Sequence, residues 1–103
     1  MTLEDLFDII ETRAQADPSE SWTAKLLSQG AEKCAKKFGK ESAEAIIEAA
    51  KGDRTALTAE AADVLYHLLV MLKSRDVALA DVMAELDWPQ AQSGLAEKTG
   101  RKT

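Results

Sequence analysis

Four acidic side chains have the type and the spacing of a metal site. Glu41 and Glu44 are three residues apart, and Glu60 and Asp63 repeat that spacing. Helical residues three apart lie on one face, so each pair would present two carboxylates in the same direction. The 15 residues between Glu44 and Glu60 suffice to finish one helix, turn, and begin an antiparallel one. We therefore expect the two pairs to face each other.

Carboxylates gathered in this way favour the chemistry of a hard divalent cation. Burying like charges is costly unless something positive lies among them. Oxygen ligands suit Mg²⁺, with Mn²⁺ as a second choice, and bound Mg²⁺ usually keeps waters and accepts substrate phosphates. The combination fits hydrolysis of a phosphoanhydride, in which the metal neutralises the polyphosphate and a carboxylate orients the attacking water. The spacing leaves open which carboxylate does so.

The neighbouring residues bear on this interpretation. A single acidic pair is typical of any solvated helix face. Asp63, however, directly precedes Val64 and Leu65 in the most apolar stretch, and we expect a buried setting there in which an idle carboxylate is costly. His67 is predicted to be a hydrogen-bonded core residue rather than a ligand. Cys34 is predicted to be a small buried hydrophobe.

Local signals define the helices that would position these residues. Apolar residues at helical spacing, Ser21 and Asp53 as N-caps, and Gly30 and Gly52 as breaks mark the boundaries. The predicted helices span residues 2–16, a short segment after Ser21, 31–51, 54 to about 75, and 78–87, the last closed by Trp88 and Pro89. Residues 93–103 form a polar tail. We expect one all-α domain over residues 1–103, a small bundle of about five helices.

The fourth predicted helix points to self-association. Apolar residues from Val64 to Leu72 cover nearly its whole circumference, and a helix apolar on all sides is buried on all sides. A domain of 103 residues with short helices has little material with which to surround it. A second subunit would complete the core, so a homodimer or a larger homo-oligomer is expected.

Composition excludes other classes of function. The formal net charge of −5 argues against a nucleic-acid-binding surface. We see no run approaching the eighteen or so apolar residues of a membrane span, and the acidic start of the chain is unlike a signal peptide. A single cysteine fits a reducing compartment. These features predict a cytoplasmic protein without a membrane or nucleic-acid partner.

Four stretches of the chain resemble a known family. The stretches KFGKESAE (37–44) and EAADVLYHLLV (60–70) are similar to the phosphoribosyl-ATP pyrophosphohydrolases, all-α enzymes of the MazG-like superfamily. Three features resemble this family rather than its relatives: the tyrosine–histidine pair of ADVLYHLLV (62–70), SWTAKLL (21–27) and GLAEKTGRK (94–102). Two positions depart from the family pattern, because Lys40 stands where glutamate is frequent and Trp22 where tyrosine is frequent. Both glutamates of the metal motif and an aromatic ring are kept, so the resemblance to this class of enzyme holds.

The resemblance implies a reaction and roles for residues. Phosphoribosyl-ATP would be hydrolysed to phosphoribosyl-AMP and pyrophosphate, the second step of histidine biosynthesis. Mg²⁺ would be held by Glu41, Glu44, Glu60 and Asp63. The candidates for substrate binding are Ser21, Trp22, Thr23, Lys25 and Lys37, whereas most other lysines nearby, Lys33, Lys36 and Lys40, are expected to be solvated. Two alternatives stay open: a general MazG-like nucleoside triphosphate pyrophosphohydrolase, and a non-catalytic helical dimerisation module.

Overall fold

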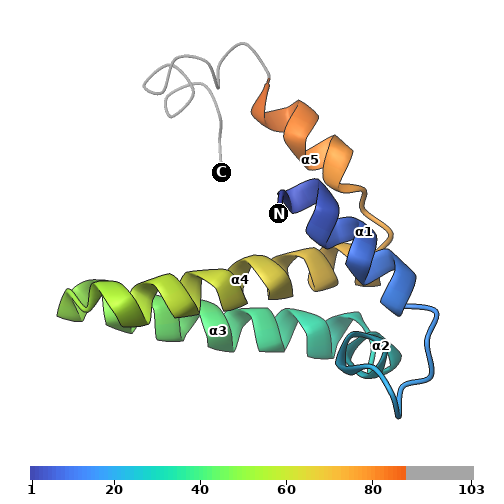
Figure 1. Ribbon diagram of the computed structural model, residues 1–103, viewed down its shortest axis with the longest axis horizontal. Helices are drawn as coiled ribbons and strands as arrows, with labels where there is room; N and C mark the ends of the chain where they lie inside the picture. The colour runs from blue at the N-terminus through green and yellow to red at the C-terminus, as the bar shows by residue number, and fades with distance from the viewer. Residues whose placement is uncertain (88–103) are drawn as a thin grey trace.

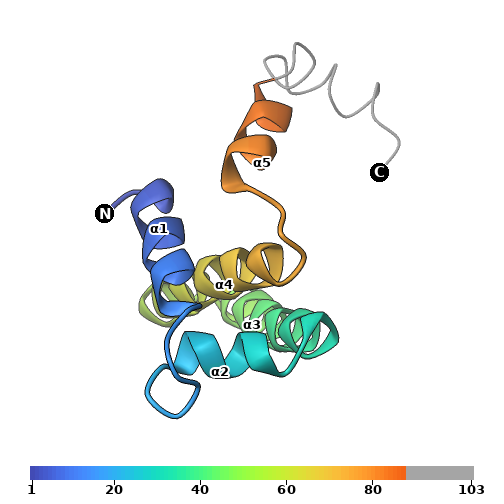
Figure 2. The same ribbon diagram turned by 90° about the vertical axis from the view of Figure 1, so that its right-hand side faces the viewer.

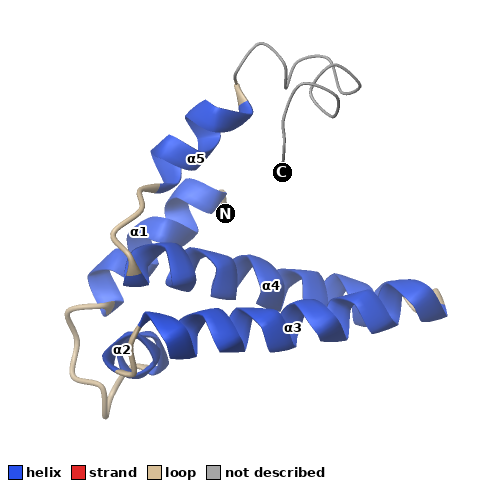
Figure 3. Cartoon of the chain, turned by 180° about the vertical axis from the view of Figure 1, so that it is seen from behind, coloured by secondary structure: helices blue, strands red, loops and turns tan. Residues whose placement is uncertain are grey.

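The computed structural model describes residues 1–87 and confirms a small all-α bundle. Its five helices within that range are joined by loops, with no strand among the described residues (Figure 3). The helices are α1 (Leu3–Arg13), α2 (Trp22–Ser28), α3 (Ala31–Lys51), α4 (Arg54–Ser74) and α5 (Leu79–Leu86). The predicted closure of the last helix at Trp88 and Pro89 and the predicted polar tail lie outside the described residues.

Helices α3 and α4 form a long antiparallel hairpin (Figure 1). Gly52 ends α3 in the left-handed region, with φ of 77°, and its N–H donates to the carbonyl of Glu48 at 3.1 Å. Asp53 begins α4, because its side chain accepts the N–H of Ala56 at 2.9 Å. These two local signals confirm the predicted boundaries. Only Gly52 and Asp53 connect the two helices, so the turn is short.

The apolar core lies at the open end of the hairpin. There α1 and α2 pack against α4, and α2 lies across the hairpin while α5 stands away from it (Figure 2). The core residues come from all five described helices: Phe7, Ile10, Leu26, Cys34, Leu69, Val70 and Leu79. The turn end of the hairpin therefore projects beyond the core, which gives the chain its length of 46 Å.

The first helix is shorter than its predicted range of 2–16, because it ends at Arg13. The N–H of Ala16 bonds to the carbonyl of Arg13 at 3.0 Å, three residues back, so the backbone has left α geometry. Asp17 then holds a turn through the N–H of Ser19 at 2.8 Å. Asp17 and the proline after it impose this turn, and residues 14–16 before it lie outside the helix. The apolar spacing did not indicate that earlier end.

Helix α4 is less covered than its composition predicts. It has the length and apolar composition of a membrane span, yet only 17% of its most apolar window is buried within the chain. His67, Leu69 and Val70 are buried, whereas Leu65 is 41% exposed. Burial on all sides is therefore wrong for the single chain. Helices α1, α2 and α3 pack against α4 and cover part of its apolar surface.

The turn supplies a test of the backbone argument with a matched pair of substitutions. Gly52→Ala should destabilise the fold by about 1 kcal/mol, because its positive φ disfavours any side chain. Gly39→Ala should stabilise it by about 0.5–1 kcal/mol, because Gly39 lies within α3 with open space around it. Urea unfolding followed by circular dichroism measures both. Equal effects of the two substitutions would contradict the assigned role of the turn.

Candidate metal centre

Three of the four predicted carboxylates meet across the hairpin. Glu41 of α3 and Glu60 and Asp63 of α4 each offer an oxygen, and these oxygens lie within 4.8 Å of one another. The turn explains the meeting, since Glu41 and Asp63 are each eleven residues from Gly52. The two acidic pairs thus face each other, as their spacing predicts.

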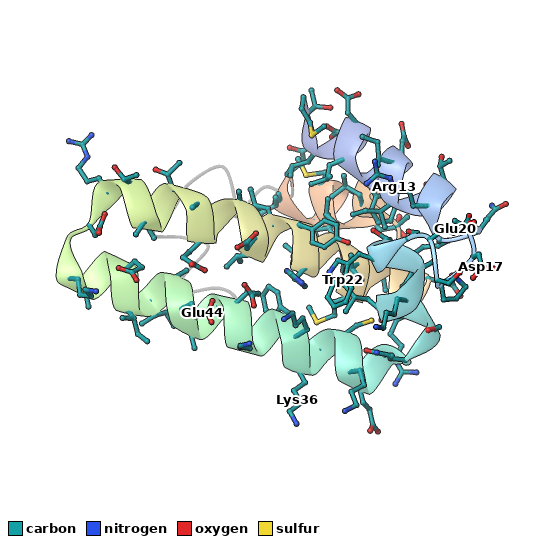
Figure 4. The ribbon with its side chains drawn as sticks, turned by 60° about the horizontal axis from the view of Figure 1, so that its bottom comes forward. Arg13, Asp17, Glu20, Trp22, Lys36 and Glu44 are labelled. Atoms are coloured by element: carbon teal, nitrogen blue, oxygen red, sulfur yellow. The ribbon has the colours of Figure 1, made fainter. Side chains whose placement is uncertain are left out.

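Glu44 completes the acidic group from the next turn of α3. Glu44 and Glu60 are each eight residues from Gly52, and Glu44 lies midway along the hairpin (Figure 4). Burial first, and then the negative charge of Glu44, raise the pKa of Glu60, with Asp63 and Glu41 adding to the rise. One oxygen of Glu60, Oε2, is buried without a hydrogen-bond partner among the described residues. The centre therefore holds more negative charge than its surroundings neutralise.

The buried acid is not the one that the sequence suggests. Asp63 is exposed in the single chain, so its expected burial is wrong, whereas Glu41 is only 7% exposed. Within residues 1–87, the cation that pairs with Glu41 is Lys37, whose Nζ lies 3.7 Å from Oε2, one helical turn away. Apolar neighbours in the sequence occupy other faces of a helix, so they do not determine how much of Asp63 is covered.

His67 and Tyr66 belong to the packing around the centre. His67 is buried, its Nδ1 lies 2.8 Å from the carbonyl oxygen of Asp63, and its ring meets Tyr66 edge-on at 4.9 Å. The hydroxyls of Tyr66 and Thr23 are 2.6 Å apart and connect α4 to α2. This confirms His67 as a hydrogen-bonded core residue, and it places Thr23 in a structural contact rather than at a free surface.

The other predicted substrate residues have separate tasks. Ser21 caps α2 by accepting the N–H of Ala24 at 3.1 Å. Trp22 is 52% exposed, and Nζ of Lys25 lies 5.9 Å from the centre of its ring, within cation–π range. Trp22 and Lys25 are thus the exposed residues of this segment, with Trp22 at the end of α2 that faces the hairpin (Figure 4).

Two grooves meet at Trp22. One, of about 590 Å³, runs toward α1 and α4 past Arg13, Glu20 and Tyr66. The other, of about 430 Å³, runs along α3, and we call it the lysine groove. Besides Trp22, it is lined by Leu26, Gln29, Lys33, Lys36, Lys37 and Lys40. Lys25, a predicted phosphate ligand, is not among its lining residues.

The lysine groove is the feature that sequence reasoning missed. Lys33, Lys36, Lys37 and Lys40 recur at helical spacing, the signal of a common face, but such a stripe is usually a solvated surface. Only the packing of α2 beside α3 turns the stripe into the wall of a groove. That packing depends on contacts distant in the sequence, such as the bond between Thr23 and Tyr66.

The acidic group has the donor set of a hard cation site. Its ligand atoms are carboxylate oxygens, which Mg²⁺ and Mn²⁺ prefer. A cation would also give the orphaned oxygen of Glu60 a partner and relieve the repulsion among the four carboxylates. The residues present therefore fit a divalent metal ion.

Comparison with known proteins matches the geometry to a family. The family model described as phosphoribosyl-ATP pyrophosphohydrolase matches residues 3–90. A phosphoribosyl-ATP pyrophosphatase of Roseobacter denitrificans is 67% identical over 101 residues, which cover 98% of this chain and 96% of that protein. The similarly named proteins of Ruegeria pomeroyi and Cereibacter sphaeroides are 66% and 65% identical, each over 96% of this chain and 94% and 96% of their own lengths.

Charge repulsion at the centre predicts an effect on stability. The pKa of Glu60 in the folded protein is raised above the ordinary 4.5. The stability that protonated Glu60 contributes is therefore fully present below pH 4.5 and is lost as the pH rises through the pKa of the folded state. Glu60→Gln should therefore stabilise the metal-free protein at pH 7 and change little at pH 4. Urea unfolding in the presence of a chelator measures this.

The matched control for that substitution is Glu85→Gln, which removes an exposed carboxylate of α5 that is not part of the acidic group. Saturating Mg²⁺ should remove the advantage of Glu60→Gln, since the cation supplies the same relief. A variant that is less stable than wild type at pH 7 without metal would show that repulsion does not dominate at Glu60.

Proposed function

The chain belongs to the phosphoribosyl-ATP pyrophosphohydrolase family, and from this premise we propose how its acidic centre acts on phosphoribosyl-ATP. The reaction is hydrolysis to phosphoribosyl-AMP and pyrophosphate in histidine biosynthesis. Water adds to phosphorus, the anhydride bond between the α and β phosphates breaks, and pyrophosphate leaves with the electron pair of that bond. The proton of the water passes to a base on the protein.

One observation carries the assignment of the site: carboxylates from two helices meet in a group whose charge is not neutralised. We assign Glu41, Glu44, Glu60 and Asp63 as the residues that hold Mg²⁺, with Mn²⁺ as a substitute. The bound ion supplies charge neutralisation for the phosphates and polarises the phosphorus centre. The buried, unpartnered oxygen of Glu60 is the strongest single support.

The protein's own groups complete the chemistry. Glu44 lies beside Glu60 but outside the group of three close oxygens, so besides its part in holding the ion we assign one of its two carboxylate oxygens to orient water and accept its proton. Lys37, next to Glu41, is placed to contact a phosphate oxygen as charge shifts to the leaving pyrophosphate. Both residues stand on α3, whose rigid helix fixes their separation.

The segment from Ser21 to Lys25 forms the substrate mouth. Trp22 offers an exposed aromatic face for the adenine base, and Lys25 lies over the same ring, where it adds positive charge. The hydroxyls of Ser21 and Thr23 are engaged in capping α2 and in bonding Tyr66. They therefore act by holding Trp22 in place.

A direct assay tests the proposal. The protein should release pyrophosphate from phosphoribosyl-ATP in the presence of Mg²⁺, and a chelator should stop the release. Glu44→Gln keeps the shape of the side chain and removes its charge, so it should lower kcat by about 100-fold or more while the helical circular dichroism is retained. Glu48→Gln is the matched control, because Glu48 lies one turn further along α3 and pairs with Lys51 at 3.6 Å.

Other outcomes separate the alternatives. Equal rates on several ordinary or modified nucleoside triphosphates would favour a general MazG-like pyrophosphohydrolase. Absence of release from every phosphoanhydride would favour the non-catalytic dimerisation module. Unchanged Mg²⁺-dependent activity in Glu44→Gln would contradict the role given to Glu44.

We also propose a homodimer or a larger homo-oligomer, in the cytoplasm, with no nucleic-acid or membrane partner. The hairpin supports self-association, because Leu65 of α4 and Ile46 and Ile47 of α3 are 41%, 68% and 54% exposed. Large apolar side chains on one long hairpin form a surface that a second copy can cover. The same association would bury the apolar remainder of α4.

A charge on this surface should disrupt the oligomer. Leu65→Glu should move the equilibrium toward monomer, because association would have to bury the new carboxylate. Leu65→Met keeps the apolar surface and should keep the oligomer. Sedimentation equilibrium over a range of protein concentrations measures both. A wild-type chain that sediments as a monomer at all concentrations would contradict the proposal.

A further inference from the structure

The lysine groove has a charge that sets it apart from the rest of this acidic chain. Four lysines line it and no carboxylate does, although the whole chain has a net charge of −5. The groove between α1 and α5 is lined by Glu4, Asp8 and Glu11 and is acidic. The groove that holds Arg13 also holds Glu20 and is neutral. Positive charge is thus concentrated along one face of α3.

The lysine groove begins at the metal centre. Lys37 lines the groove and also contacts Glu41 at 3.7 Å, so one side chain borders both sites. Lys40 precedes Glu44 by one helical turn on the same side of α3. A phosphate chain held at the carboxylates would therefore meet Lys37 and Lys40 first.

The outer part of the groove is too far away for the same phosphates. Lys33 precedes Glu41 by eight residues, which places it about 12 Å further along the helix axis. Lys36 points away from α4 on the outer side of α3 (Figure 4). A triphosphate centred on the carboxylates is too short to reach across the two helical turns to Lys33. Lys33, and Lys36 on the outer side of α3, are therefore available to another part of the ligand.

The groove and the substrate have matching parts. In phosphoribosyl-ATP the reacting phosphates are followed by a ribose, the adenine base, a second ribose and its phosphate. The groove offers groups for each part: Lys37 beside the carboxylates, the exposed ring of Trp22, and Lys33 and Lys36 further from the carboxylates. An aromatic face suits the base, and paired ammonium groups suit a phosphate monoester.

We propose that Lys33 and Lys36 form a subsite for the phosphate of the second ribose, with Trp22 against the base between that subsite and the metal centre. This inference rests on the proposed function and adds the origin of its specificity. ATP lacks the second ribose phosphate, so it leaves the subsite empty. Phosphoribosyl-ATP is preferred because it fills the subsite and brings charge to two ammonium groups.

The test is the double variant Lys33→Gln with Lys36→Gln. The matched control is Lys51→Gln with Arg54→Gln, which removes two positive charges at the turn end of the same hairpin. Kinetics with phosphoribosyl-ATP are combined with calorimetric affinities for phosphoribosyl-AMP, AMP and pyrophosphate. All four lost side chains are exposed, and circular dichroism confirms that each variant is folded.

The subsite predicts a selective loss. The groove variant should raise KM for phosphoribosyl-ATP about tenfold and leave kcat within about twofold, because the lost contacts are charge-assisted and remote from the reacting bond. Its affinity for phosphoribosyl-AMP should fall by the same factor, while its affinities for AMP and pyrophosphate stay unchanged. The control variant should match wild type in every measurement.

Two results would overturn the subsite. A parallel loss of affinity for pyrophosphate would show that the outer lysines bind the leaving group instead. An unchanged preference for phosphoribosyl-AMP over AMP would show that they do not contact the ligand. Both are distinct from failure of the proposed function, in which wild-type protein itself releases no pyrophosphate from phosphoribosyl-ATP.

Discussion

The tight turn between α3 and α4 sets the register on which the rest of the structure depends. Gly52 can end α3 because it adopts a positive φ, and Asp53 can start α4 because its side chain accepts the amide N–H of Ala56 in the first turn. With so short a connection, residues equally distant from Gly52 lie opposite each other. A slip of one residue would rotate the acidic side chains by about 100° and separate them. The metal centre is therefore a consequence of backbone geometry at the turn.

In the hairpin of α3 and α4, the repulsion between carboxylates and the apolar packing that stabilises the fold lie at different positions along the two helices. The carboxylates repel each other along the part of the hairpin nearer the turn, away from the apolar core. Cys34, Leu69 and Val70 hold the same two helices together at the open end, together with residues of α1 and α2. Because the helices are rigid, packing at one end maintains a close approach of like charges along the rest. The repulsion that remains is available to bind a cation.

Local signals made the helices predictable, whereas contacts distant in the sequence decided the environment of the site. Ser21, Gly52 and Asp53 act on amides within a few residues, so their effects can be read from the sequence. The burial of Glu41 and the exposure of Asp63 depend on which faces α2 and α4 present, and spacing alone does not specify that. Spacing could predict that the carboxylates meet, but it could not rank them by burial.

The lysine groove also explains how an acidic chain can accommodate a substrate rich in phosphate. Charges further apart than about 8 Å are largely screened at physiological salt, so the nearest side chains determine the local potential. Helix α3 separates the two signs along its axis, with lysines over its first half and the glutamates of the centre after them. A ligand that is anionic throughout then meets ammonium groups directly and meets the carboxylates through a cation. Net charge sets the behaviour of the whole protein in solution, while the order of charges along one helix sets the direction in which its ligand lies.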